Sequence, residues 1–144
     1  YKDKVDSIVS FGVLEHVENP QQYLKDAYSL LKKGGKMYLE TDNLHDVLME
    51  LNINSFDEFL YRTAHLWYFE EKTLKQMVEQ ASFSNIKISF RHNFDMSNVM
   101  LWLRDNKPTG NGKLDFLSNG VDQNWIEFVE SSGLADLVCI EMTK

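Results

Sequence analysis

The sequence predicts an α/β fold built around a parallel strand crossover, and three patterns near its start support this. Residues 5–11, VDSIVSF, are β-branched and apolar with few interruptions, as in a strand covered on both faces. Residues 20–33 carry apolar side chains at helical spacing, and residues 36–41, KMYLET, read as a second strand. A strand, a helix and a strand joined by short loops are typical of parallel strands in one sheet.

End signals predict the limits of the first helix. Asn19 is a favourable N-cap residue, and Pro20 suits the first helical position. The Lys-Lys pair at 32–33 is expected in the last turn, where positive charge complements the helix dipole. The Gly-Gly pair at 34–35 is then expected to end the helix.

The rest of the chain contains shorter patterns and no repeats. Ser55 and Glu58 have the spacing of a capping box at the start of a helix. Further helices are expected at 43–51, 71–81 and 122–133, and further strands at 85–94 and 134–144. Residues 107–113, KPTGNGK, form the clearest loop. Because no linker divides the chain, residues 1–144 are expected to form a single domain.

Composition excludes several classes of partner. The net charge is −7, from 15 basic and 22 acidic residues, so no basic excess is present to bind nucleic acid or an anionic membrane. No apolar run approaches the roughly 20 residues of a membrane span. The single cysteine, Cys139, lies in an apolar run and is expected to be a buried thiol, which fits a cytoplasmic location. The four histidines show no metal-ligand spacing with it, so no metal site is expected.

Residues 5–41 resemble the second half of class I S-adenosylmethionine-dependent methyltransferases, from the fourth strand onward. The resemblance lies in VDSIVSFGVLEHVENP and YLKDAYSLLKKGGKMYLET: a strand running into LEH, a helix ending in LLK-x-GG, and then the next strand. Residues 65–83, 95–110 and 135–144 are similar to later parts of the same enzymes. The resemblance implies a partial doubly wound, Rossmann-like sheet of order 4-5-7-6, with the last strand antiparallel and helices on both faces.

The family's glycine-rich cofactor loop after strand one, and the acidic residue that ends strand two, have no counterpart here. We therefore expect Tyr1 to be a cut end and the chain to be the C-terminal portion of such an enzyme. This portion is expected to bind S-adenosylmethionine poorly and to be inactive alone. The strand at 5–11 would then be an exposed edge, and we expect it to pair with the missing N-terminal half or with a second copy.

The carboxyl end of the first strand is the expected position of the cofactor, because open α/β sheets bind ligands at such ends. Phe11, Gly12 and Val13 form this turn, and the resemblance implies that they and Glu15 contact S-adenosylmethionine. His16 is a candidate general base, with Glu15 beside it to orient the ring. The alternative is that Glu15 and His16 only hold the loop that leads into the helix.

Candidate substrate-binding residues follow the second strand and the aromatic segment after it. Asp42 and Asn43 can face a substrate or act as helix caps. His65 is the second candidate base, and Trp67 and Tyr68 can wall off a pocket or attract a sulfonium through their rings. The alternative for these aromatic residues is a hydrophobic cluster over the sheet.

Asn98 and Trp102, on the amphipathic stretch 97–103, are expected to line the far side of that pocket or to pack in the core. Methyl transfer is an in-line displacement from an activated donor, so positioning is the main task of the protein. The expected function is methyl transfer to a small-molecule acceptor. The alternatives are an interaction module that uses the exposed strand edge, or half of a nicotinamide-dependent oxidoreductase.

Overall fold

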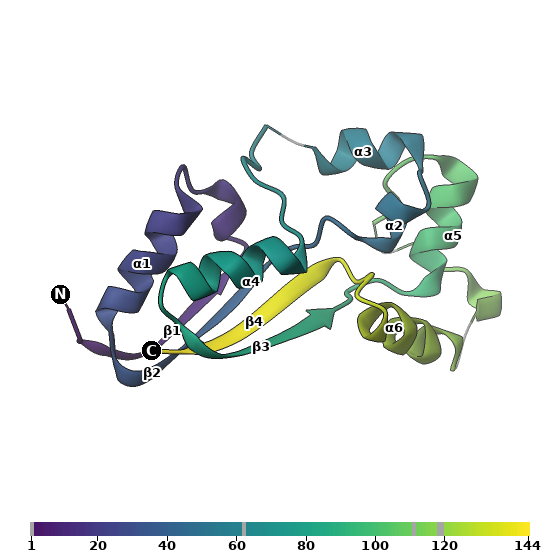
Figure 1. Cartoon of the computed structure of the whole chain (residues 1–144). Coiled ribbons are helices and arrows are strands. Elements are labelled where there is room, and N and C mark those ends of the chain that lie inside the picture. The colour runs from purple at the N-terminus through teal and green to yellow at the C-terminus, as the bar shows by residue number, and fades with distance from the viewer. Residues whose placement is uncertain (1, 62, 111, 118–119) are drawn as a thin grey trace.

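A computed structural model describes residues 2–61, 63–110, 112–117 and 120–144, and a four-stranded mixed sheet is its centre (Figure 1). The strands are β1 (Val5–Phe11), β2 (Leu31–Asp42), β3 (Ser84–Arg91) and β4 (Leu137–Thr143), in the spatial order β1-β2-β4-β3. β1 is parallel to β2, whereas β4 is antiparallel to both β2 and β3. The expected order 4-5-7-6 with an antiparallel last strand is confirmed. Tyr1 lies outside the described residues.

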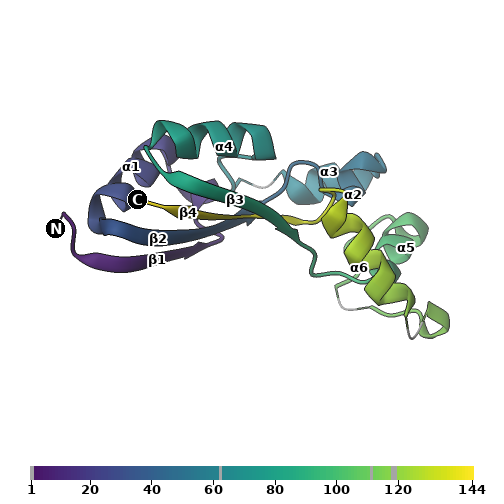
Figure 2. The same cartoon turned by 60° about the horizontal axis from the view of Figure 1, so that its bottom comes forward.

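Each connection between consecutive strands along the chain contains at least one described helix. They are η1 (Leu14–His16), α1 (Pro20–Leu30), α2 (Val47–Glu50), α3 (Asn54–Leu60), α4 (Glu71–Gln80), α5 (Met96–Asp105), η2 (Asp115–Leu117) and α6 (Val121–Ser131). α1 and α4 lie side by side on one face of the sheet, and α6 lies beyond the end of β3 on the side away from α4 (Figures 1 and 2). This mixed sheet, with α1 and α4 on one side and α6 on the other side at the sheet's end, confirms the predicted fold class. None of the described helices has the length and apolar character needed to cross a membrane.

The first helix begins as predicted but ends earlier. The Asn19 side chain accepts a hydrogen bond from the Gln22 amide (2.9 Å), and Pro20 is the first helical residue. The helix ends at Leu30, because Leu31 is already extended and pairs with Val5 in the sheet. The expectation that the lysines at 32–33 occupy the last helical turn is therefore wrong, since both belong to β2.

Two glycines shape the start of β2. Gly34 has a φ of +78°, which glycine adopts without steric strain, and its amide donates to the carbonyl of Lys144. A Cβ on Gly35 would lie 2.9 Å from the Lys32 carbonyl oxygen and 3.0 Å from that of Asp6. The pair thus allows close backbone approach at an irregularity in the β1–β2 register, instead of ending a helix.

The predicted capping box at the start of α3 is wrong. The helix begins at Asn54, one residue before Ser55, and no side chain caps its first turn. The Ser55 hydroxyl instead donates to the Asn106 side-chain oxygen at 2.8 Å, which connects α3 to the end of α5. A long-range contact has replaced the local cap.

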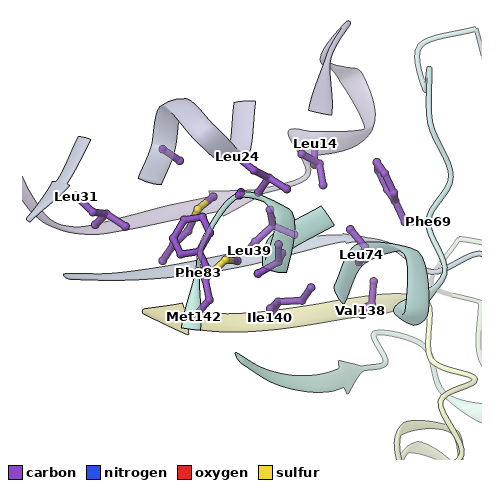
Figure 3. Close-up of a cluster of buried hydrophobic side chains, with 14 residues drawn as sticks. Leu14, Leu24, Leu31, Leu39, Phe69, Leu74, Phe83, Val138, Ile140 and Met142 are labelled. Carbon is purple, nitrogen blue, oxygen red and sulfur yellow. The ribbon is translucent and has the colours of Figure 1, made fainter. Parts of the chain in front are cut away.

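The main hydrophobic core lies between the sheet and the α1–α4 pair (Figure 3). Its fully buried side chains come from η1, α1, α4 and the central strands, and they include Leu14, Leu24, Leu31, Met37, Leu39, Leu74, Val78, Val138, Ile140 and Met142. A second cluster joins α2, α3, α5 and α6 beyond the strand ends, around Phe56, Trp102 and Val129. The thiol of Cys139 is buried in β4, as predicted.

The face of β1 away from α1 is open among the described residues. Val9 is 60% exposed and Phe11 57%, whereas Ser10 between them is buried and shares a hydrogen bond with the Tyr23 hydroxyl of α1. The expectation that residues 5–11 are covered on both faces is thus wrong for the described chain. The strand retains the pattern of a two-sided strand, but only one side is packed here.

We expect Leu24→Ala to lower the free energy of unfolding by about 2–5 kcal/mol, because Leu24 is fully buried between α1 and the sheet. Leu103→Ala is the matched control on α5, where the side chain is 57% exposed, and it should change stability by less than about 0.5 kcal/mol. Urea unfolding followed by circular dichroism measures both. Equal losses in the two variants would contradict the packing of α1 on the sheet.

Candidate functional site

The parallel pairing of β1 with β2 brings their carboxyl ends to one edge of the sheet. Phe11 pairs with Glu40, and the Gly12 amide donates to the Glu40 carbonyl at 3.0 Å, so the pairing extends into the turn. Gly12 has a φ of +59°, a conformation that favours glycine. The turn from Phe11 to Val13 is exposed and can therefore contact a ligand.

Glu15 is buried beneath this turn and joins three segments. Its carboxylate accepts a hydrogen bond of 2.7 Å from the Thr41 hydroxyl of β2. Its main-chain carbonyl accepts from the amides of Leu66 (2.8 Å) and Trp67 (3.3 Å). These contacts favour the alternative in which Glu15 holds the loop, while its proposed contact with a cofactor stays a prediction.

The two candidate bases lie together although 49 positions separate them in the sequence. The rings of His16 and His65 meet edge to face, with their centres 4.8 Å apart. The His16 Nδ1 atom lies 2.7 Å from the carbonyl oxygen of Ala64, and this atom is therefore the donor, because a carbonyl can only accept. The other nitrogen, Nε2, is 4.0 Å from the Glu15 carboxylate, so Glu15 makes no hydrogen bond that orients the ring.

The carboxylate next to a histidine is Asp42 instead. Its Oδ2 atom lies 2.9 Å from Nδ1 of His65, a close pair that is not aligned as a hydrogen bond. His65 is largely buried, with 13% of its side chain exposed. Both residues are candidates from the sequence alone, Asp42 for substrate binding and His65 as a base, but no local pattern indicates their contact.

Trp67 and Tyr68 follow His65 in the same segment of the chain. The Trp67 indole donates to the Val17 carbonyl (2.9 Å), and the Tyr68 hydroxyl donates to that of Leu60 (2.6 Å). The Tyr68 ring lies 5.9 Å from the His65 ring. Neither side chain is among the described residues that line the cavity nearby, so their role in substrate binding stays a prediction.

A cavity of about 500 Å³ opens next to the end of β2, between α2, α3, α5 and the loop that follows α5. Four residues that the sequence analysis proposed for substrate binding line it: Asp42, Asn43, Asn98 and Trp102. The structure adds further carboxylates and aromatic rings, namely Asp46, Asp136, Phe56, Phe59 and Phe94. Asp42 therefore belongs both to the cavity wall and to the contact with His65.

Three of the predicted lining residues also hold the wall in place. The Asn43 amide donates to the carbonyls of Gly133 (2.9 Å) and Ala135 (2.8 Å), which connects the end of β2 to the start of β4. Asn98 lies near the loop after α5, and Trp102 packs edge to face on Phe56 with ring centres 5.2 Å apart. Their contact with a substrate stays a prediction.

Asp46 and Asp136 are the acidic residues that sequence reasoning missed. Asp46 caps α2 by accepting from the Leu48 amide at 2.7 Å, and burial raises the pKa of its carboxyl to about 6. The charges of Asp136 and Asp42 raise this pKa further, whereas the Leu48 hydrogen bond and the charge of His92 lower it. A capping aspartate before a short helix was visible in the sequence, but nothing local indicated burial beside two other carboxylates.

Asp136 is held from several sides. Its carboxylate accepts from the amide and the side chain of Asn93 (2.9 and 2.8 Å), and Oδ1 lies 3.1 Å from Nδ1 of His92. His92 is itself buried. Among the described residues, no group of three or more histidine, cysteine or acidic side chains is placed to hold a metal ion.

Comparison with known proteins gives one family match and many structural matches. The family described as a methyltransferase domain matches residues 1–88. A structure from Thermotoga maritima, described as a possible histamine N-methyltransferase, has a TM-score of 0.65 at 18% identity, over 99% of this chain and 57% of its own. No curated protein matches the sequence.

Two further structures place the same fold in other proteins. A methyltransferase from Archaeoglobus fulgidus has a TM-score of 0.59 at 20% identity, over 99% of this chain and 61% of its own. Phosphoethanolamine N-methyltransferase 2 from Haemonchus contortus, in complex with S-adenosyl-L-methionine, has a TM-score of 0.57 at 17% identity and is covered over 34% of its length. The present chain thus spans 61% or less of each of these proteins.

The raised pKa of Asp46 makes a prediction about stability and pH. Because the carboxyl binds its proton more tightly in the folded than in the unfolded chain, stability should fall as the pH rises from about 4 to about 6. Asp46→Asn lacks this titration and keeps an oxygen to accept from Leu48. Relative to the natural chain it should gain up to about 3 kcal/mol at pH 7.5 and nearly nothing below pH ~4.

Urea unfolding at several pH values measures this difference. Asp57→Asn, on the exposed surface of α3, is the matched control, and its effect on stability should not follow the same pH dependence. A loss of stability in Asp46→Asn at pH 7.5 would contradict the described burial of the Asp46 carboxylate.

Proposed function

Because this chain belongs to the methyltransferase-domain family, we propose that it is the C-terminal portion of an enzyme that transfers a methyl group from S-adenosylmethionine to a small molecule. The observation that supports this most is that an exposed β1 turn and a cavity of about 500 Å³ flank the same sheet edge. Similar structures include proteins described as a possible histamine N-methyltransferase and a phosphoethanolamine N-methyltransferase, both named for small acceptors.

The exposed turn fits one side of the methyl donor. Phe11, Gly12 and Val13 would contact S-adenosylmethionine there, and the small Gly12 leaves its backbone open to close approach. When bound, the cofactor supplies a methyl group that is already activated on a sulfonium. Further contacts would come from residues outside this sequence, which lacks the family's glycine-rich loop, and the 144-residue chain alone is proposed to be inactive.

The residues of this chain would mainly orient the acceptor and handle a proton. We assign the base to His65, because the Asp42 carboxylate lies 2.9 Å from its Nδ1 and leaves Nε2 to take a proton. Asp42 connects this pair to the cavity wall, where Asn98 and Trp102 would contact the acceptor. His16, whose Nδ1 is engaged with Ala64, would pack against His65 and fix its ring.

The open edge and face of β1 provide the proposed contact with the rest of the enzyme. Val9 and Phe11 are exposed there, and an apolar strand edge favours pairing with another strand. We propose that residues 1–144 form one domain unit with an N-terminal half that adds strands at this edge, and that the enzyme is cytoplasmic. A non-catalytic interaction module is the second candidate, because the same exposed strand would then bind a partner.

Titration of S-adenosylmethionine by calorimetry tests the proposal. The 144-residue chain should show little or no binding, and a version extended by the upstream coding sequence should bind. Absence of binding by both versions would exclude the methyltransferase proposal in favour of the interaction module. A natural start of translation at Tyr1 would favour the same alternative.

In the extended version, His65→Gln should lower kcat about 10²-fold or more, with KM changed little, because a base acts in the transition state. The measurement is transfer of labelled methyl groups from S-adenosylmethionine to a panel of small amines, alcohols and carboxylates. His45→Gln is the matched control, since His45 lies on the surface against Glu50 and should leave kcat unchanged. Equal rates in the two variants would remove His65 from the mechanism.

A further inference from the structure

The cavity combines two kinds of lining, carboxylates and aromatic rings. Carboxylates of Asp42, Asp46 and Asp136 line it, and none of the described lining residues is lysine, arginine or histidine. Aromatic rings form much of the remaining wall: Phe56, Phe59, Phe94 and Trp102. Negative charge and aromatic faces both attract an organic cation, and both are unfavourable for an anion.

Asp46 is the residue in this wall that most needs a cationic partner. Only 6% of its surface is exposed, and one carboxylate oxygen accepts from the Leu48 amide. The second oxygen accepts no hydrogen bond among the described residues, and it is not one of the fully enclosed polar atoms that lack a partner, so it keeps some access to the cavity. A largely buried carboxylate loses much of its hydration, and a cation in the cavity would offset that cost.

Asp136 adds negative charge to the cavity wall but is not proposed to pair directly with the cation. Both of its oxygens accept from Asn93, so its position is fixed by the loop after β3. Asp136 and Asp42 both raise the pKa of Asp46, which means that their charges act on it across the cavity wall. A bound cation would be stabilised by these charges together.

We propose that this cavity binds the ammonium group of an organic amine, with the apolar body of the amine against the aromatic rings. The proposal rests on the proposed function in one respect only, that this amine is also the methyl acceptor. The bound ammonium would then first give a proton to His65, because only the neutral nitrogen has the lone pair that takes the methyl group. The volume of about 500 Å³ suits a small molecule. Asp42 belongs to the cavity wall and also contacts His65, so the acceptor would face His65 from the Asp42 side of the cavity.

Binding of three molecules of matched shape tests the proposal without S-adenosylmethionine. Phenethylamine is the cationic probe, 2-phenylethanol the neutral one and phenylacetate the anionic one. Calorimetry or ligand-observed NMR at pH 7.5 should show phenethylamine binding at least about tenfold more tightly than phenylethanol, with phenylacetate weakest; tenfold corresponds to about 1.4 kcal/mol. Equal binding of the three probes would overturn the proposal.

Substitutions in the cavity wall test which side chains cause the preference for the cationic probe. Asp46→Asn should reduce the preference for phenethylamine over phenylethanol about tenfold, while binding of phenylethanol is retained. Asp57→Asn, on exposed α3 and not among the lining residues, is the matched control and should retain the full preference. Phe59→Leu removes one aromatic face and should weaken phenethylamine more than phenylethanol. An unchanged preference in Asp46→Asn would overturn the assignment.

The two proposals fail in different experiments. Selective amine binding by a protein that binds no S-adenosylmethionine in its extended form would support the cation site and exclude methyl transfer. Binding of S-adenosylmethionine by the extended form, without selection for the amine in either form, would support methyl transfer and exclude the cation site.

Discussion

The hydrogen bond from the Thr41 hydroxyl to the buried Glu15 carboxylate holds the candidate site together. It joins the helical turn after β1 to the end of β2, and the Glu15 carbonyl joins both to the segment at 66–67. Loss of the donor would leave a buried carboxylate oxygen unpaired, which costs roughly 1–3 kcal/mol or more. The neighbouring His16–His65 contact and the Asp42–His65 pair depend on the same three segments meeting at this point.

The two faces of the sheet differ in how far other parts of the described chain cover them. One face is packed by α1 and α4 over a continuous core, and the side chains there are fully buried. The other carries the Phe11–Tyr38 ring contact and the Glu40–Arg91 ion pair, with Val9 and Phe11 exposed. A strand with apolar residues on both sides, packed on only one, has the character of an interface. The described chain thus has a well-packed hydrophobic core on one face of the sheet and an exposed edge strand, β1, next to the candidate site.

The burial of the Asp46 carboxylate in the cavity wall costs stability, and folding alone does not explain why this arrangement is kept. A domain that buried Asp46 only to cap a four-residue helix could use the neutral side chain of asparagine, which caps equally well. Burial beside Asp136 and Asp42 opposes ionisation and lowers stability near neutral pH. Functional sites are where such unfavourable arrangements are retained, because a ligand supplies the missing interaction. The net charge of the whole chain gave no indication of this local concentration.

The sequence by itself determined the β1–α1–β2 unit and its Asn19 cap, because these follow from local periodicity and end signals. The strand order was expected only from the family resemblance. It misplaced the end of α1 and the cap of α3, where long-range partners outweighed local preference. Only the tertiary structure placed Asp42 against His65 and gathered Asp46, Asp136 and the phenylalanines around one cavity. These residues come from segments that are far apart in the chain, and no local pattern encodes which distant side chains the packing of separate elements will bring into contact.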